Sequence, residues 1–212
     1  MRGWRELIVV LSVFCSLCAQ AMTDKELLDA YRHEDMSVWK EYVDRLQLEG
    51  NKTVTPDLVE SGLLYVYGYC GYLAAEAKKE GQEVLLPKAK QYVRYFKSEV
   101  IRHKSQLSKG HYEMYMSAVY VYELRLKESV HPLKAMSLAK EATKLAPEDP
   151  LVLSYYGTCL FYAPKPFGSK AEALKWFERA KPLFAGDRYR FCWVREANEM
   201  YIDQCYEKLK KQ

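Results

Sequence analysis

The residue types that most often carry chemistry are scattered along this chain rather than clustered. Its histidines fall at four separated positions: His33, His103, His111 and His131. No HExxH or HxH spacing is present, so no two imidazoles are placed to share a metal ion. The GxSxG, GxxxxGK[ST] and GxGxxG motifs of nucleophile, phosphate and dinucleotide sites are also missing. We therefore predict a protein without catalytic residues, metal site or cofactor, which is not an enzyme.

The cysteines show no redox or metal pattern either. Two of the six lie in the apolar N-terminal segment, and the other four lie far apart without a CxxC pair: Cys70, Cys159, Cys192 and Cys205. Each of these four sits in a helical pattern, where free cysteine is typically a small buried core residue. We favour free thiols, with disulfides as the alternative, because an exported chain can hold them and four cysteines allow three pairings.

Residues 1–21 have the composition of a secretory signal peptide. Arg2 and Arg5 precede an apolar run that extends to about Ala19, and Ala19-Gln20-Ala21 matches an A-x-A cleavage site. The run is shorter than the roughly 20 residues that span a bilayer, which argues against a retained membrane anchor. The residues before its two cysteines are not small, which argues against a lipid anchor. We expect an exported protein, periplasmic or extracellular, with one mature domain at 22–212.

Composition and charge exclude several classes of partner. Lysine and arginine number 32 against 28 acidic residues, and the net charge of +4 is too balanced for a nucleic-acid surface. An aromatic content of 14% and a hydrophobic content of 49% exclude intrinsic disorder. No segment after the N-terminal one is long and apolar enough to span a membrane. The mature chain is therefore predicted to be a folded domain that neither binds nucleic acid nor spans a membrane.

Hydrophobic residues recur at helical spacing along the mature chain, and no segment alternates as a strand does. Thr55-Pro56 and Asp149-Pro150 each join an N-cap residue to a proline at the first helical position. We predict an all-α fold, with helices over these approximate ranges: 24–33, 36–48, 56–79, 84–106, 111–128, 132–146, 150–163, 170–184 and 190–210. Short turns between such helices make sequential neighbours antiparallel.

A pattern of residues returns after 34 positions in two of these segments. Val119-x2-Tyr122-Glu123-x2-Leu126 is repeated as Leu153-x2-Tyr156-Gly157-x2-Leu160. Helix-packing residues follow each copy: Ala135, Ala139, Ala142 and Pro147 after the first, then Ala173, Phe177 and Ala180. Over about 116–184 this pattern resembles the tetratricopeptide repeat (TPR). The signature of that repeat is W-x2-L-G-x2-Y, then A-x3-F, then P.

The resemblance implies antiparallel helix pairs stacked as a short TPR-like α-solenoid. Its best repeats would lie at about 116–149 and 150–187, followed by a helical cap at 188–212. The match departs from the TPR consensus, because Glu123 replaces a glycine and Ala139 a phenylalanine. A turn with four extra residues, at 163–170, makes the chain similar to exported bacterial members of the family.

In such a stack the first helix of each pair lines the concave face. The resemblance assigns these residues to that face: Tyr65, Tyr72, Tyr120, Leu124, Lys127, Ser154, Thr158, Phe161, Tyr162, Tyr189 and Glu196. Phe167, in the inserted turn, is placed to close one end. Tyrosine suits recognition because it joins a large rigid surface to one hydroxyl, although aromatic stripes at helical spacing also fill helix interfaces. We predict an aromatic groove for a peptide or protein partner in the cell envelope.

Two other functions fit the same sequence. The first is a small-ligand carrier accessory to a solute transporter, a role that the resemblance to exported members implies. The second is a structural subunit that stacks on another copy of itself. A carrier should have a largely enclosed cavity, a binding module an open groove, and a structural subunit an exposed apolar flank. The sequence alone does not choose among the three.

Overall fold

A computed structural model describes residues 24–49, 55–129 and 132–211, in which the regular structure is helical throughout. The α-helices of these ranges are 24–32, α2 (Met36–Glu49), α3 (Pro56–Glu76), α4 (Leu86–Arg102), α5 (His111–Arg125), α6 (Pro132–Leu145), α7 (Pro150–Tyr162), α8 (Lys170–Ala180) and α9 (Trp193–Lys210). The all-α prediction is confirmed. The predicted signal peptide at 1–21 lies outside the described residues.

Helix starts follow the capping signals of the sequence. The Thr55 hydroxyl accepts a hydrogen bond from the Leu58 N–H at 3.4 Å, and α3 begins at the proline between them. One Asp149 carboxylate oxygen accepts from the N–H groups of Leu151 and Val152 at 2.9 and 3.2 Å. These contacts satisfy backbone donors that have no partner inside the helix, so the first turns of α3 and α7 are fixed locally.

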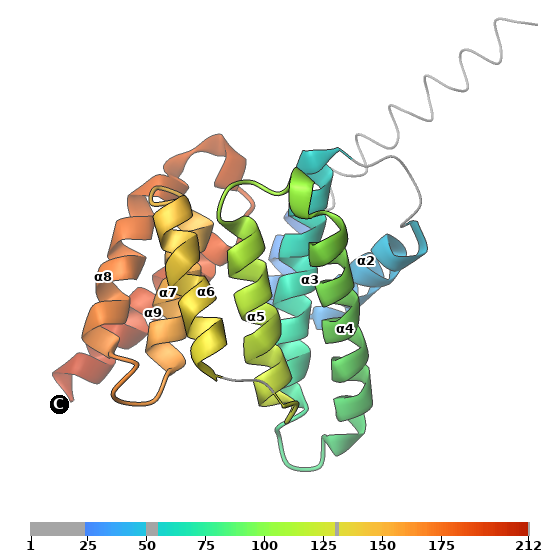
Figure 1. Ribbon diagram of the computed structural model, residues 1–212, viewed down its shortest axis with the longest axis horizontal. Helices are drawn as coiled ribbons and strands as arrows, with labels where there is room; N and C mark the ends of the chain where they lie inside the picture. The colour runs from blue at the N-terminus through green and yellow to red at the C-terminus, as the bar shows by residue number, and fades with distance from the viewer. Residues whose placement is uncertain (1–23, 50–54, 130–131, 212) are drawn as a thin grey trace, which may run out of the picture.

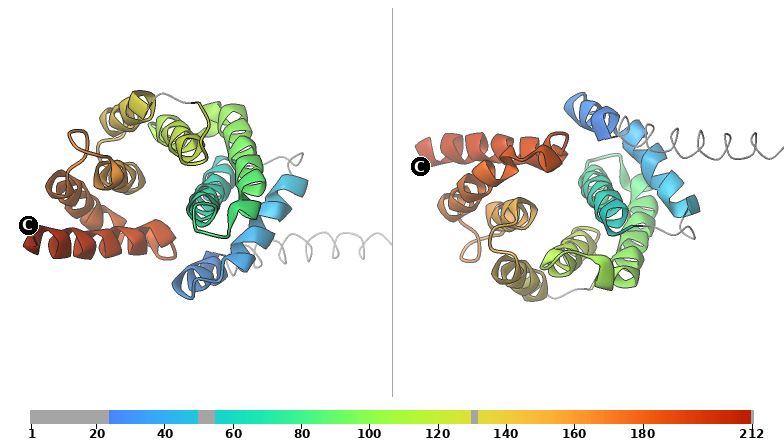
Figure 2. Two further views of the ribbon diagram at one scale, coloured as in Figure 1. Left: turned by 90° about the horizontal axis from the view of Figure 1, so that it is seen from below. Right: turned by 90° about the horizontal axis from the view of Figure 1, so that it is seen from above.

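Successive helices pack as pairs, α3 against α4, α5 against α6 and α7 against α8. Figures 1 and 2 show that α3, α5 and α7 lie on the inside of a ring and that α4, α6 and α8 lie outside them. Small residues permit the close approach: Ala173 and Ala180 of α8 have no exposed surface. A Cβ added at Gly157 would lie 2.8 Å from a ring carbon of Phe177, so a larger residue at position 157 would separate α7 from α8.

The ring is closed by contacts between helix 24–32 and α9 (Figure 2). The Arg32 guanidinium donates to the Glu196 carboxylate, with Nε–Oε1 at 2.9 Å, across 164 positions of sequence. Next to this ion pair the Trp193 ring packs against Tyr31 and Trp39, with centroids 5.6 and 5.4 Å apart. The two ends of the helical array therefore meet, and the inner helices surround a central space.

The four cysteines of the described residues are free thiols. Cys70, Cys192 and Cys205 are buried and Cys159 is half-buried, so the preference for free thiols over disulfides is confirmed. Burial raises the pKa of both Cys159 and Cys192 to about 11, which keeps these thiols protonated at neutral pH. Within the described part of the chain, no helix has the length and apolar character that crossing a bilayer requires.

Candidate ligand-binding cavity

The inner helices surround a cavity of about 1320 Å³. Its walls come from α3, α5 and α7, with further residues from helix 24–32, α2, α6 and α9. The aromatic side chains that line it are Tyr31, Trp39, Tyr67, Tyr72, Tyr122, Tyr155, Tyr162, Phe167, Trp193 and Tyr201. Helical periodicity explains this concentration, because one face of each inner helix points to the centre of the ring.

The cavity has its mouth at the C-terminal ends of α3, α5 and α7. The large hydrophobic residues of the lining that are exposed lie at this end: Tyr72 is 38% exposed, Leu133 51%, and Tyr162 and Phe167 55% each. Toward the N-terminal ends of the same helices the lining residues Met114 and Leu151 are buried. The cavity is therefore a pocket open at one end.

A buried charged network ties together the ends of α3, α5 and α7 that lie opposite the mouth. His111 is 1% exposed, with Nε2 3.0 Å from an Asp149 carboxylate oxygen and Nδ1 3.3 Å from a Glu60 carboxylate oxygen. The Arg188 guanidinium donates to the other Glu60 oxygen at 3.1 Å, and the Ser108 N–H also donates to Glu60. One imidazole thus joins α3, α5 and the cap of α7.

The pKa values of this network favour its charged form. Burial alone would lower the pKa of His111, but the hydrogen bond to Asp149 and the nearby Glu60 carboxylate outweigh it and raise the pKa to about 9. Burial would raise the pKa of Glu60, but the contacts with His111 and Ser108 lower it to about 2. His111 is therefore an imidazolium between two carboxylates at neutral pH, an arrangement that positions helices and leaves no free base.

Two tyrosine hydroxyls of the cavity wall are engaged in the protein itself. Tyr122 donates to the backbone carbonyl of Tyr67 at 3.0 Å, and Tyr155 donates to the Ser117 hydroxyl at 2.8 Å. Burial raises the pKa of Tyr122 and Tyr155 well above the usual value, so both stay neutral. These contacts hold the two rings in place, so that the rings present mostly apolar surface to the cavity.

The predicted groove residues divide into two groups. Those that line the cavity are Tyr72, Leu124, Ser154, Thr158, Tyr162 and Phe167. Those that do not are Tyr65, Tyr120, Lys127, Phe161, Tyr189 and Glu196. In the second group Tyr65 and Phe161 are buried in the core, Tyr120 lies under Lys97 and Lys134, and Glu196 pairs with Arg32.

Several lining residues were not singled out from the sequence, although a signal for them exists. Val121 and Tyr155, Leu124 and Thr158, and Arg125 and Cys159 all line the cavity, and the members of each pair are 34 positions apart. Only the second pair belonged to the predicted groove. The same 34-residue offset, applied one residue after the predicted pairs Tyr120–Ser154 and Leu124–Thr158, would have found the other two.

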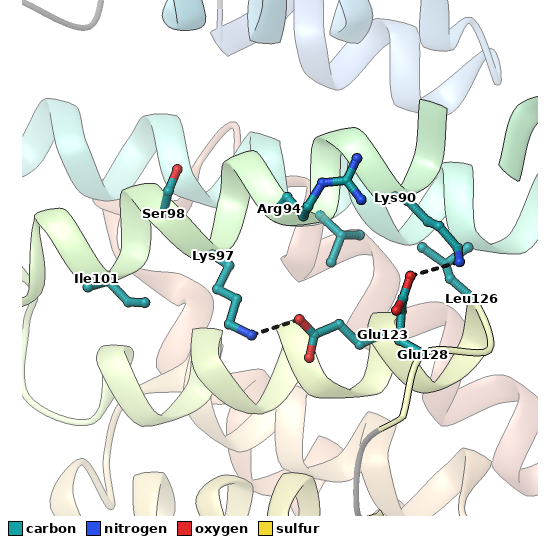
Figure 3. A pocket seen from close by; sticks show the side chains of 9 residues that line it. Lys90, Arg94, Lys97, Ser98, Ile101, Glu123, Leu126 and Glu128 are labelled. Atoms are coloured by element: carbon teal, nitrogen blue, oxygen red, sulfur yellow. Dashed lines mark hydrogen bonds and ion pairs between the residues drawn. The ribbon is translucent and has the colours of Figure 1, made fainter. Parts of the chain in front are cut away.

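A second hollow, of about 450 Å³, lies outside the ring between α4 and α5 (Figure 3). Lysines and acidic residues face each other across it, with Lys90 Nζ 2.7 Å from Glu128 and Lys97 Nζ 2.8 Å from Glu123. Most of its charge is therefore neutralised by ion pairs. Arg94, labelled in Figure 3, extends from α4 on this outer side.

The described residues contain no group of three or more histidine, cysteine or acidic side chains arranged to hold a metal ion. Comparisons of the chain with protein-family models, curated proteins and solved structures gave no match. The cavity is therefore the main candidate for a functional site in the described residues.

Proposed function

We propose that this protein is a non-catalytic carrier that holds a small apolar or amphiphilic ligand inside the ring. The observation that carries the proposal is the aromatic cavity of about 1320 Å³, whose exposed large hydrophobic lining residues gather at one end. Ligand pockets of proteins enclose about 300–1,000 Å³ and are mostly apolar, with a few polar groups that orient the ligand. The cavity has this character and can accommodate a ligand of that size together with some water.

A peptide or protein partner is the second candidate. Tyr162 and Phe167, each 55% exposed at the rim, favour it, because exposed aromatic residues are typical of interaction surfaces. An extended peptide, however, needs a groove that is open along its length. A pocket closed at one end admits a compact ligand or a chain end, so we prefer the carrier.

We further propose that α3–α4, α5–α6 and α7–α8 are TPR-like repeats. The paired packing supports this, and so do the lining positions 34 residues apart. We place the carrier outside the cytoplasm, in the cell envelope, as the signal-like composition of residues 1–21 suggests.

The first test is the binding of a neutral apolar dye, N-phenyl-1-naphthylamine, measured by its fluorescence. We expect the wild type to bind it and Ala118→Trp to lose most of the affinity, because Ala118 lines the middle of the cavity and indole would occupy the space. Thr158→Trp, at a half-buried lining position, is a second obstructing variant in case Ala118→Trp does not fold.

Ala171→Trp is the matched control, because Ala171 is exposed on the outer helix α8. It should bind the dye as the wild type does. Equal binding by the control and both obstructing variants, each shown by circular dichroism to be folded, would place the dye outside the cavity and contradict the carrier proposal.

A further inference from the structure

The charged residues that line the cavity are confined to its mouth. They are Glu34 in the turn before α2, Glu76, Lys78 and Lys79 at the end of α3, and Arg125 in the last turn of α5. Lys79 Nζ lies 2.5 Å from Glu76, and this pair is neutral as a unit. The mouth therefore carries a small excess of positive charge, and the remaining wall carries none.

Arg125 is the least exposed cation of this set. It is half-buried, and its guanidinium lies 5.3 Å from the centroid of the Tyr162 ring. No ion pair joins it to an acidic residue of the described chain within 4 Å. The guanidinium is therefore partly desolvated, lies over an aromatic ring and has unpaired hydrogen-bond donors. Such a group can bind an anion that comes from outside the protein.

The field of Arg125 extends to α7, the neighbouring inner helix. Burial raises the pKa of Cys159 on α7, and both the Tyr155 hydrogen bond and the positive charge of Arg125 act against that rise. Arg125 and Cys159 also occupy equivalent positions 34 residues apart, so both face the cavity. An anionic group placed between α5 and α7 would therefore be within the influence of the guanidinium.

The deep part of the cavity offers a different environment. Leu64, Met114, Ala118 and Leu151 line it from three inner helices, and no charged side chain accompanies them. Hydrocarbon transferred from water to such a wall gains roughly 0.8 kcal/mol for each buried methylene group, whereas a charged group there would lose its hydration without compensation.

We propose that the cavity binds a single-chain amphiphile, with an anionic head group on Arg125 at the mouth and a hydrocarbon chain directed toward the closed end. This inference rests on the proposed carrier function and adds the chemical class of the ligand. The planar guanidinium fork matches carboxylate and phosphate oxygens in the same bidentate manner, so both head groups belong to this class.

The test measures displacement of N-phenyl-1-naphthylamine at pH 8 by four probes that share a ten-carbon chain. Decanoate and decyl phosphate carry the anion, decan-1-ol is neutral and decylamine is cationic. We expect at least one anionic probe to bind about tenfold to a hundredfold more tightly than decan-1-ol, as is usual for hydrogen bonds to charged groups. The tighter anion identifies the preferred head group.

Arg125→Gln should remove this preference and leave the affinity for decan-1-ol within about twofold of the wild type. Arg94→Gln is the matched control, because Arg94 lies on the outer helix α4 (Figure 3) and should keep the full preference. Arg125→Lys should keep part of it, since charge remains while the bidentate fork is lost.

Two results would overturn the inference and leave the carrier proposal intact, provided that the wild type still binds the dye and Ala118→Trp still weakens that binding. The first is equal binding of all four probes. The second is tighter binding of decylamine than of both anions. An anion preference that survives Arg125→Gln would overturn the role of Arg125. Failure of the dye and of every probe to bind would reject the carrier itself.

Discussion

His111 shows how a single buried residue can determine pH dependence in this protein. Its pKa of about 9 exceeds the ordinary value of 6.5, so its contacts stabilise the folded state fully below pH 6.5 and are lost as the pH rises through about 9. The Glu60 carboxylate, with a pKa of about 2 against 4.5, contributes above pH 4.5 and loses its contribution only as the pH falls toward 2. Both stabilising contributions are complete between about pH 4.5 and 6.5.

We expect His111→Gln to lower the free energy of unfolding by on the order of 3 kcal/mol at pH 6, and by much less at pH 10, since one pKa unit corresponds to about 1.4 kcal/mol. Urea unfolding at pH 6, 8 and 10 measures the difference. His33→Gln, in an exposed turn, is the control and should follow the wild type. A deficit of His111→Gln that is the same at all three pH values would show that the imidazolium is not the source of the stability.

At the scale of helices, local sequence signals account for most of what is observed. The caps at Thr55 and Asp149 identify the starts of α3 and α7, and predicted and observed helix ends differ by only a few residues. Which residues of each helix face the cavity and which face the core is harder to predict. Successive residues rotate by about 100° around a helix, so Tyr65 lies in the core while Tyr67, two positions later, lines the cavity.

The same limit applies to the cavity as a whole. The faces of α5 and α7 were inferred from a degenerate repeat pattern, and which side of a helix meets its neighbours depends on packing over long sequence separations. Contacts such as Arg32 with Glu196, 164 positions apart, leave no local pattern that would reveal them. The helices could therefore be predicted to within a few residues at their ends, whereas the closed ring could not.

Gly68 marks the position where α3 meets both ends of the array. A Cβ at this position would lie 2.4 Å from a ring carbon of Trp39 and 2.8 Å from one of Trp193, so a methyl group cannot enter without displacing an indole. We expect Gly68→Ala to destabilise the protein by about 1–3 kcal/mol. Thermal unfolding followed by circular dichroism measures the loss.

Gly186→Ala provides the matched control for that substitution. Gly186 has φ of −73°, which alanine adopts readily, and nothing lies within 4 Å of an added Cβ. It should be neutral or more stable by about 0.4–1 kcal/mol, because alanine restricts the unfolded chain. Equal effects of the two substitutions would contradict the close contact at Gly68.

At the scale of the whole molecule, the ring depends on Trp193. Its indole packs against Tyr31 of the first described helix, Trp39 of α2 and Tyr67 of α3, with centroids 5.4–5.7 Å apart. The first residue of α9 thus contacts three elements from the start of the chain. Aromatic pairs in these geometries add to the free energy gained from burial.

We expect Trp193→Ala to lower the free energy of unfolding by about 3 kcal/mol or more and to accelerate amide hydrogen exchange in helix 24–32. Trp176→Ala is the control, because Trp176 lies on α8 and packs on Tyr156, with centroids 4.8 Å apart. This control should lose stability, but the rate of amide hydrogen exchange in helix 24–32, compared with that in the other helices, should stay unchanged. If both variants accelerate exchange in that helix equally, the closure does not depend on Trp193.

The closed ring also restricts how this architecture can change in evolution. An open stack of helix pairs can lengthen by one unit, since each pair contacts only its neighbours. Here an additional pair would move α9 away from helix 24–32 and break the Arg32–Glu196 contact. The number of pairs and the width of the cavity are thus linked. The proposed carrier function would therefore adapt to ligands of another size by substitutions on the inner faces rather than by addition of a helix pair.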